Sequence, residues 1–132
     1  MDLQDFSPCL LKLVERQEFE AQKFGFYWEN FHQLIEQIQS ECIEVQDAWQ
    51  QENLPHLQEE IGDLIQAAIS LAVFCKLDPQ DTLLKSIKKF QQRYDLVVQM
   101  AQNDGYENLH KQPFEILMDY WNRAKIKMKP SV

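Results

Sequence analysis

The sequence is poor in the residues that build turns, strands and phosphate-binding loops. Its 132 residues include only three glycines, one threonine and five serines. Because Gly25, Gly62 and Gly105 stand far apart, a glycine-rich loop that wraps a phosphate group or a dinucleotide is excluded. In contrast, 15 leucines and 17 glutamines favour helices. The composition therefore predicts an all-α protein.

Other features that the sequence lacks bear on the binding partners of the protein and on its location in the cell. Lys and Arg number 13 against 21 Asp and Glu, so the net charge of −8 argues against binding to a nucleic acid polymer. The most apolar run, residues 64–75, is shorter than the roughly 20 residues of a membrane span. The N-terminus lacks the basic and apolar regions of a signal peptide, and Cys9, Cys42 and Cys75 form no CxxC pair. We expect a cytoplasmic protein with reduced thiols that fill the core, without disulfides or membrane contact.

Prolines and glycines divide the chain into helices. Pro55, Pro79 and Pro113 stand where helices would begin, as does Pro8, and Gly25 stands where one would end. The predicted helices span about residues 7–23, 30–51, 54–76, 79–103 and 113–127. Because no repeat or long linker interrupts them, we expect a single domain over residues 1–132, a bundle of four to five helices.

Apolar side chains follow the helical period and indicate which faces are buried. In the second predicted helix one stripe is assigned to the core: Leu34, Ile38, Cys42, Val45 and Trp49. The third predicted helix is apolar almost all round between residues 64 and 75. At the surface of a small monomer, such a helix would expose apolar side chains to water. We therefore expect a homodimer whose interface includes this helix and completes the core.

Two pairs of acidic residues lie on consecutive predicted helices. Glu41 and Glu44 are three residues apart, as are Glu60 and Asp63, so each pair shares one helix face. A short connection would make the two helices antiparallel neighbours, with both pairs facing one groove. Carboxylates crowded at the edge of a core need a cation to stay ionised, and oxygen ligands suit Mg²⁺, or Mn²⁺ in its place. The alternative is that these acids are ordinary solvated positions.

A basic stripe occupies the fourth predicted helix. Lys85, Lys89 and Arg93 follow each other at intervals of four residues, with Lys88 alongside. Like charges at this spacing destabilise a helix, and an anionic ligand would offset that cost. The alternative is that the stripe pairs with acids of a neighbouring helix or stays in water.

Taken together, these features resemble a known family. Glu41 to Glu44 and Glu60 to Asp63 resemble the EExxE…ExxD signature of the MazG-type all-α nucleoside triphosphate pyrophosphohydrolases. Three further segments are similar to that family's aromatic lead-in, its KFxxRF segment and its closing tryptophan motif: 24–28, FGFYW; 89–94, KFQQRY; and 119–125, DYWNRAK.

The resemblance implies a magnesium-dependent hydrolase that converts nucleoside triphosphates to monophosphates and pyrophosphate, with a role in clearing unwanted nucleotides. It implies a dimer or a dimer-based assembly such as a tetramer. The implied metal ligands are Glu41, Glu44, Glu60 and Asp63. The implied catalytic residues are Glu41, Lys89 and Arg93, and the implied substrate-binding residues are Lys85, Lys89, Arg93 and Trp121, with Trp28 as a second candidate for contact with the nucleoside.

The sequence departs from the family pattern at three positions. Ser40 replaces the first Glu of the EExxE motif, Ile87 replaces an asparagine that precedes the KFxxRF segment, and Gln37 stands where many members carry a basic residue. These changes keep two alternatives open. One is a protein of the same fold that binds a metal and a nucleotide but hydrolyses it slowly or not at all, and the other is a helical interaction module.

Overall fold

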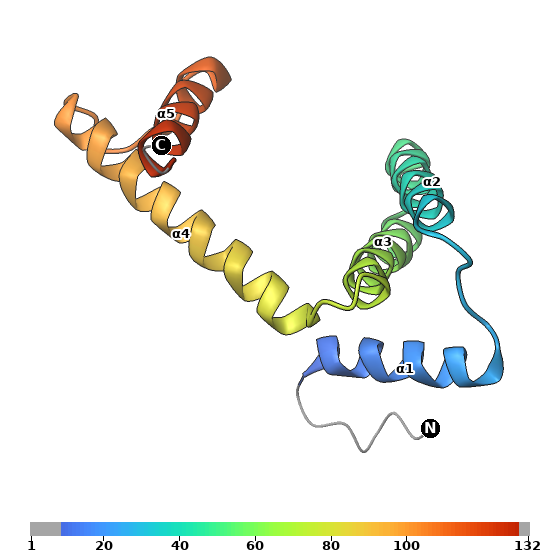
Figure 1. The fold of residues 1–132 in the computed structure, drawn as a ribbon. Coiled ribbons are helices and arrows are strands. Elements are labelled where there is room, and N and C mark those ends of the chain that lie inside the picture. Colours follow the sequence, from blue (N-terminus) through green and yellow to red (C-terminus); the bar gives the residue numbers. More distant parts are fainter. Residues whose placement is uncertain (1–8, 130–132) are drawn as a thin grey trace. The chain divides into compact units, whose positions relative to one another are not determined.

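The computed structural model describes residues 9–129, and all the regular structure in this range is helical. Five helices follow one another along the chain (Figure 1): α1, Leu10–Phe24; α2, Phe31–Gln50; α3, Leu54–Phe74; α4, Pro79–Asn103; and α5, Phe114–Met128. The predicted all-α class is confirmed, and the helix ends lie within about two residues of their predicted positions, except that α1 begins at Leu10, three residues after its predicted start. Residues 7 and 8, at the predicted start of the first helix, lie outside the described residues.

Local side-chain chemistry explains where these helices begin and end. The Asn30 side chain accepts a hydrogen bond from the Gln33 backbone N–H at 2.9 Å and caps α2, and Asp78 caps α4 by accepting from Asp81 at 2.9 Å. Gly25 terminates α1 at φ 95°, a left-handed conformation that costs glycine little. Such local signals are readable in the sequence, which is why the helix positions could be predicted.

The chain forms two compact units, residues 1–82 and 83–132, so that the boundary falls within α4. In the first unit α2 and α3 form a helical hairpin, and α1 packs against α3 (Figure 1). In the second unit the later part of α4 packs against α5 around Met100, Ala101, Tyr120 and Ala124. The single domain expected from the sequence over residues 1–132 stays a prediction.

The buried face of α2 differs from the predicted one. The buried residues are Leu34, Glu41 and Ala48, each seven residues from the next, whereas Cys42 is exposed and Trp49 is 70% exposed. The assignment of these two side chains to the core is therefore wrong for a single chain. The buried line shares Leu34 with the predicted stripe but follows a neighbouring line along the helix, which places the Glu41 carboxylate in the middle of the buried face.

Two other expectations concern the cysteines and the membrane. Cys9, Cys42 and Cys75 are free thiols, as predicted, but Cys42 and Cys75 are exposed, so their assignment to the core is wrong. In the described part of the chain, no helix is both long and apolar enough to cross a bilayer.

Candidate metal centre

Three of the four predicted acidic ligands meet where α2 faces α3. Glu41 comes from the middle of α2, and Glu60 and Asp63 come from successive turns of α3. One carboxylate oxygen from each of the three residues lies within 4.8 Å of the others. Glu60 and Asp63 are brought together by their spacing on one helix, and the hairpin adds Glu41 from the other. The structure thus assembles three carboxylates around a space of the size that one cation occupies.

Glu44, the fourth predicted ligand, stands beside this group at its exposed side. It follows Glu41 by one helical turn, and its carboxyl raises the pKa of the Glu41 carboxyl. Glu41 and Glu60 are only 8% and 9% exposed, whereas Glu44 and Asp63 are exposed. The cluster therefore has two buried carboxylates, Glu41 and Glu60, and two exposed ones, Glu44 and Asp63.

The hydrogen bonding of the two buried carboxylates is incomplete. Gln37 donates its amide N–H to Glu41 Oε1 at 2.7 Å, and His56 Nδ1 lies 3.8 Å from Glu60 Oε1. The other oxygen of each carboxylate, Glu41 Oε2 and Glu60 Oε2, is buried without any partner among the described residues. Buried polar atoms are nearly always satisfied, so two such oxygens in one cluster indicate that a further group belongs there.

The electrostatics of the cluster point the same way. Burial raises the pKa of the Glu41 carboxyl above its ordinary value, and the neighbouring carboxyl of Glu44 raises it further. The charge of Asp63 adds to the rise, whereas the amide of Gln37 partly opposes it. A divalent cation would lower the pKa of the Glu41 carboxyl again, because it would stabilise every ionised carboxylate at once.

This raised pKa predicts how the stability of the metal-free protein depends on pH. Because folding raises the pKa of Glu41, its stabilising contribution is present below the unfolded-state pKa and is lost as the pH rises through the folded-state pKa. In EDTA, Glu41→Gln is therefore expected to melt at a higher temperature than the wild type at pH 7, with the difference shrinking toward pH 4. Thermal unfolding followed by circular dichroism measures this difference, and a variant that is less stable at pH 7 would contradict it.

The predicted basic residues and Trp121 lie in the second unit, whereas Trp28 lies in the first. Lys85 and Lys89 are exposed on α4, whereas Arg93 is half-buried. The Arg93 guanidinium carbon lies 5.6 Å from the centroid of the Trp121 ring, which belongs to α5. The structure thus brings Arg93 and Trp121 into contact, and their assignment to substrate binding stays a prediction.

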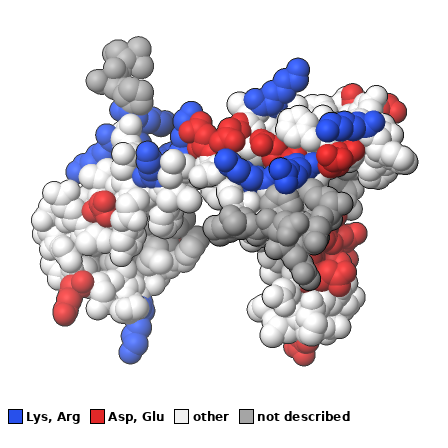
Figure 2. Space-filling view, turned by 90° about the horizontal axis from the view of Figure 1, so that it is seen from below, with Lys and Arg blue, Asp and Glu red and all other residues white. Residues whose placement is uncertain are grey.

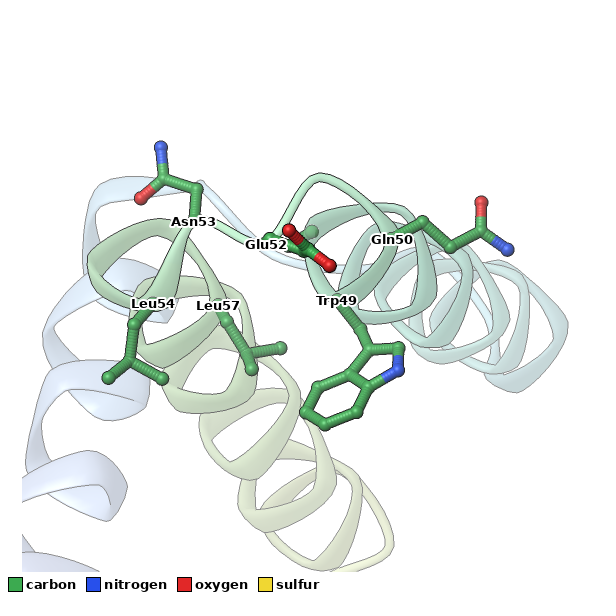
Figure 3. A pocket seen from close by; sticks show the side chains of 7 residues that line it. Trp49, Gln50, Glu52, Asn53, Leu54 and Leu57 are labelled. Carbon is green, nitrogen blue, oxygen red and sulfur yellow. The ribbon is translucent and has the colours of Figure 1, made fainter.

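Two hollows in the first unit involve other tryptophans. Figure 3 shows the larger, about 420 Å³, at the α2–α3 turn, where the Trp49 ring and the side chain of Leu57 flank the space between the helices. Trp28 lines the other, about 390 Å³, together with Tyr27 and Phe74. The sequence did not predict the first hollow. The spacing of the apolar residues on α2 does not show whether Trp49 is buried in the core or exposed beside a hollow.

The comparison with protein families decides the relationship. Residues 29–98, more than half of the chain, match the MazG nucleotide pyrophosphohydrolase domain. The chain belongs to the MazG family. The match includes all four acidic residues and the basic stripe of α4, whereas Trp121 lies outside it. The predicted family membership is confirmed.

Two relatives illustrate this membership. The chain is 31% identical over 115 residues to the nucleoside triphosphate pyrophosphohydrolase/pyrophosphatase MazG of Thermotoga maritima, an alignment that covers 87% of this chain and 44% of that protein. It is 32% identical over 74 residues to the uncharacterized protein YabN of Bacillus subtilis, covering 54% of this chain and 15% of that protein. The MazG-family chain thus spans less than half the length of these relatives.

Proposed function

We propose that this protein hydrolyses nucleoside triphosphates to nucleoside monophosphates and pyrophosphate, with Mg²⁺ held by Glu41, Glu44, Glu60 and Asp63. The observation that carries the proposal is the pair of buried, unpartnered oxygens in the three-carboxylate cluster of a MazG-family hairpin. All donors are carboxylate oxygens, the ligands that Mg²⁺ prefers, and Mn²⁺ is expected to replace it. When bound, the metal would neutralise phosphate charge and activate water for attack.

The protein's own residues would orient the substrate and stabilise charge during bond cleavage. Glu41 would hold its metal-binding oxygen in place through the hydrogen bond from Gln37. Lys89 and Arg93 would bind phosphate oxygens as negative charge redistributes, and Lys85 would add positive charge along the same helix. No glycine-rich loop is needed in such a site, because metal ions and cationic side chains replace backbone N–H groups as phosphate ligands.

The cellular role that fits this chemistry is the removal of unwanted nucleotides from the pool. A second candidate function is a protein that binds a metal and a nucleotide with little or no hydrolysis. Two positions favour it: Ser40 and Ile87 depart from the family pattern that the sequence resembles, which has a carboxylate and an amide there, and both side chains are exposed in the structure.

A panel of nucleoside triphosphates separates these functions. With MgCl₂, the pyrophosphohydrolase is expected to release pyrophosphate from at least one nucleotide, and magnesium plus that nucleotide should raise the melting temperature. Stabilisation without pyrophosphate release would support the binding protein instead. The absence of both effects across the panel would contradict the proposed function and favour the helical interaction module.

We also propose that the protein acts as a homodimer through the uncovered face of α3. Ile61 and Ile65 follow each other by one turn on α3 and remain exposed, Ile65 by 56%, although α1 and α2 pack on this helix. Figure 2 shows broad areas of the surface without any charged side chain. Exposed aliphatic side chains on a central helix are typical of an interface between copies.

A further inference from the structure

Arg93 lies over one aromatic ring, that of Trp121, where a carboxylate partner would be expected. Its Nε atom is buried without a hydrogen-bond partner, and its guanidinium carbon lies 5.6 Å from the centroid of the Trp121 ring. Among the described residues Arg93 has no carboxylate partner. A guanidinium on an aromatic face is attracted by the ring while its charge remains available to an anion.

The Trp121 ring is itself fixed by neighbours on α4. The Phe90 ring lies 5.5 Å from that of Trp121, at an angle of 44°, and Phe90 stacks at 6.3 Å on Tyr94. Phe90, Arg93 and Tyr94 lie within four residues of one another on the same helix, so Trp121 packs against a single turn of α4. Its ring therefore has a defined orientation relative to Arg93.

A polar contact next to Trp121 sets the register of α5 on α4. The Tyr120 hydroxyl donates a 2.6 Å hydrogen bond to Asp104, just beyond the end of α4. The Arg123 guanidinium lies 5.0 Å from the centroid of the Tyr120 ring, and its Nη1 atom is 3.8 Å from the same carboxylate of Asp104. Because Tyr120 is buried and tied at its tip, the following residue, Trp121, is presented to α4 in one position.

We infer that Trp121 is a positioning residue that orients the Arg93 guanidinium for phosphate binding, without contacting the nucleoside itself. The inference rests on the proposed function, in which Arg93 binds a phosphate group. A carboxylate in place of the ring would also orient Arg93, but it would compete with the phosphate for the charge. The aromatic ring provides orientation without that competition, and it leaves the terminal N–H groups of Arg93 for bidentate contact.

A double-mutant cycle with inorganic tripolyphosphate as the probe tests this role, because the probe has no nucleoside. With MgCl₂ present, calorimetric affinity is expected to fall about tenfold in Trp121→Leu, the loss of an oriented cation–π contact. It should fall about 30-fold in Arg93→Ala, the loss of a charge-assisted bidentate contact. The double variant should bind no more weakly than Arg93→Ala alone, since Trp121 acts through Arg93.

Two variants serve as controls for packing. Trp121→Phe keeps an aromatic face and should bind tripolyphosphate within about threefold of the wild type. Tyr106→Leu removes a ring that packs edge-on to Tyr120, at 6.3 Å, but does not touch Arg93, so it should leave the affinity unchanged. Circular dichroism confirms that each variant is folded.

Three results would overturn the inference. They are additive losses in the double variant, a Trp121→Leu effect seen with nucleoside triphosphates but absent with tripolyphosphate, and no binding of tripolyphosphate by the wild type. The second result would assign Trp121 to the nucleoside. Failure of the proposed function is distinguishable, because it would appear as no pyrophosphate release from any nucleotide while the coupling between Trp121 and Arg93 on tripolyphosphate binding persists.

Discussion

Glu41→Gln and Asp63→Asn are each expected to lower magnesium-dependent pyrophosphate release by about 100-fold or more, because loss of residues that merely support metal ligands already costs 10–100-fold. Each substitution keeps the size and one oxygen of the side chain but removes a charged ligand. The fold should survive, since the metal-free cluster consists of carboxylates that repel one another. Initial rates at several MgCl₂ concentrations measure the loss, and circular dichroism measures the fold.

A matched substitution on the same helix controls for the change in net charge. Glu36→Gln alters an exposed side chain of α2 that pairs with His32 at 3.1 Å, outside the acidic cluster. It should retain the wild-type rate, because surface pairs of this kind contribute little. If Glu41→Gln or Asp63→Asn kept a rate near that of the wild type, the assignment of the metal ligands would be wrong.

Ile65→Asp is expected to convert a homodimer into monomers or aggregates. In a symmetric interface one substitution places a charge in both copies, and an unpaired buried charge costs several kcal/mol, so the dissociation constant should rise by about 100-fold or more. Sedimentation velocity at micromolar concentration measures the change. Gln39→Asp, which adds the same charge at an exposed position of α2, should remain dimeric.

The unmodified protein also tests the oligomeric state. A stable, folded monomer at micromolar concentration would show that the proposed dimer is wrong. If the Gln39→Asp control also dissociated, the interface would include α2 as well, where Ile43 and Trp49 are exposed.

The sequence predicted most of the fold because the decisive signals are local. A capping side chain, a proline in the first turn and a glycine after the last turn act within a few residues, as Asn30, Pro79 and Gly25 do here. The same holds for the acidic cluster. Glu60 and Asp63 share a helix face by spacing alone, and a three-residue connection between α2 and α3 is enough to bring Glu41 opposite them.

Contacts between helices could not be predicted from the spacing of residues in the sequence. Of the apolar stripe predicted on α2, Leu34 is buried but Cys42 and Trp49 are exposed, and Glu41 and Ala48 are buried instead. Periodicity identifies an apolar face and does not say which neighbour covers it. The contact of Trp121 with Arg93 was hidden for the same reason, because it depends on the register of α5 against α4.

The central claim is that the carboxylate cluster supports cleavage of a nucleoside triphosphate between its α- and β-phosphorus atoms. Phosphorus NMR of the most reactive nucleotide of the panel, incubated with the protein and MgCl₂, tests it directly. The predicted result is that the triphosphate resonances disappear and those of a nucleoside monophosphate and pyrophosphate replace them, and that EDTA or Asp63→Asn prevents the change. An unchanged spectrum for every nucleotide, or the appearance of a diphosphate with orthophosphate, would contradict it.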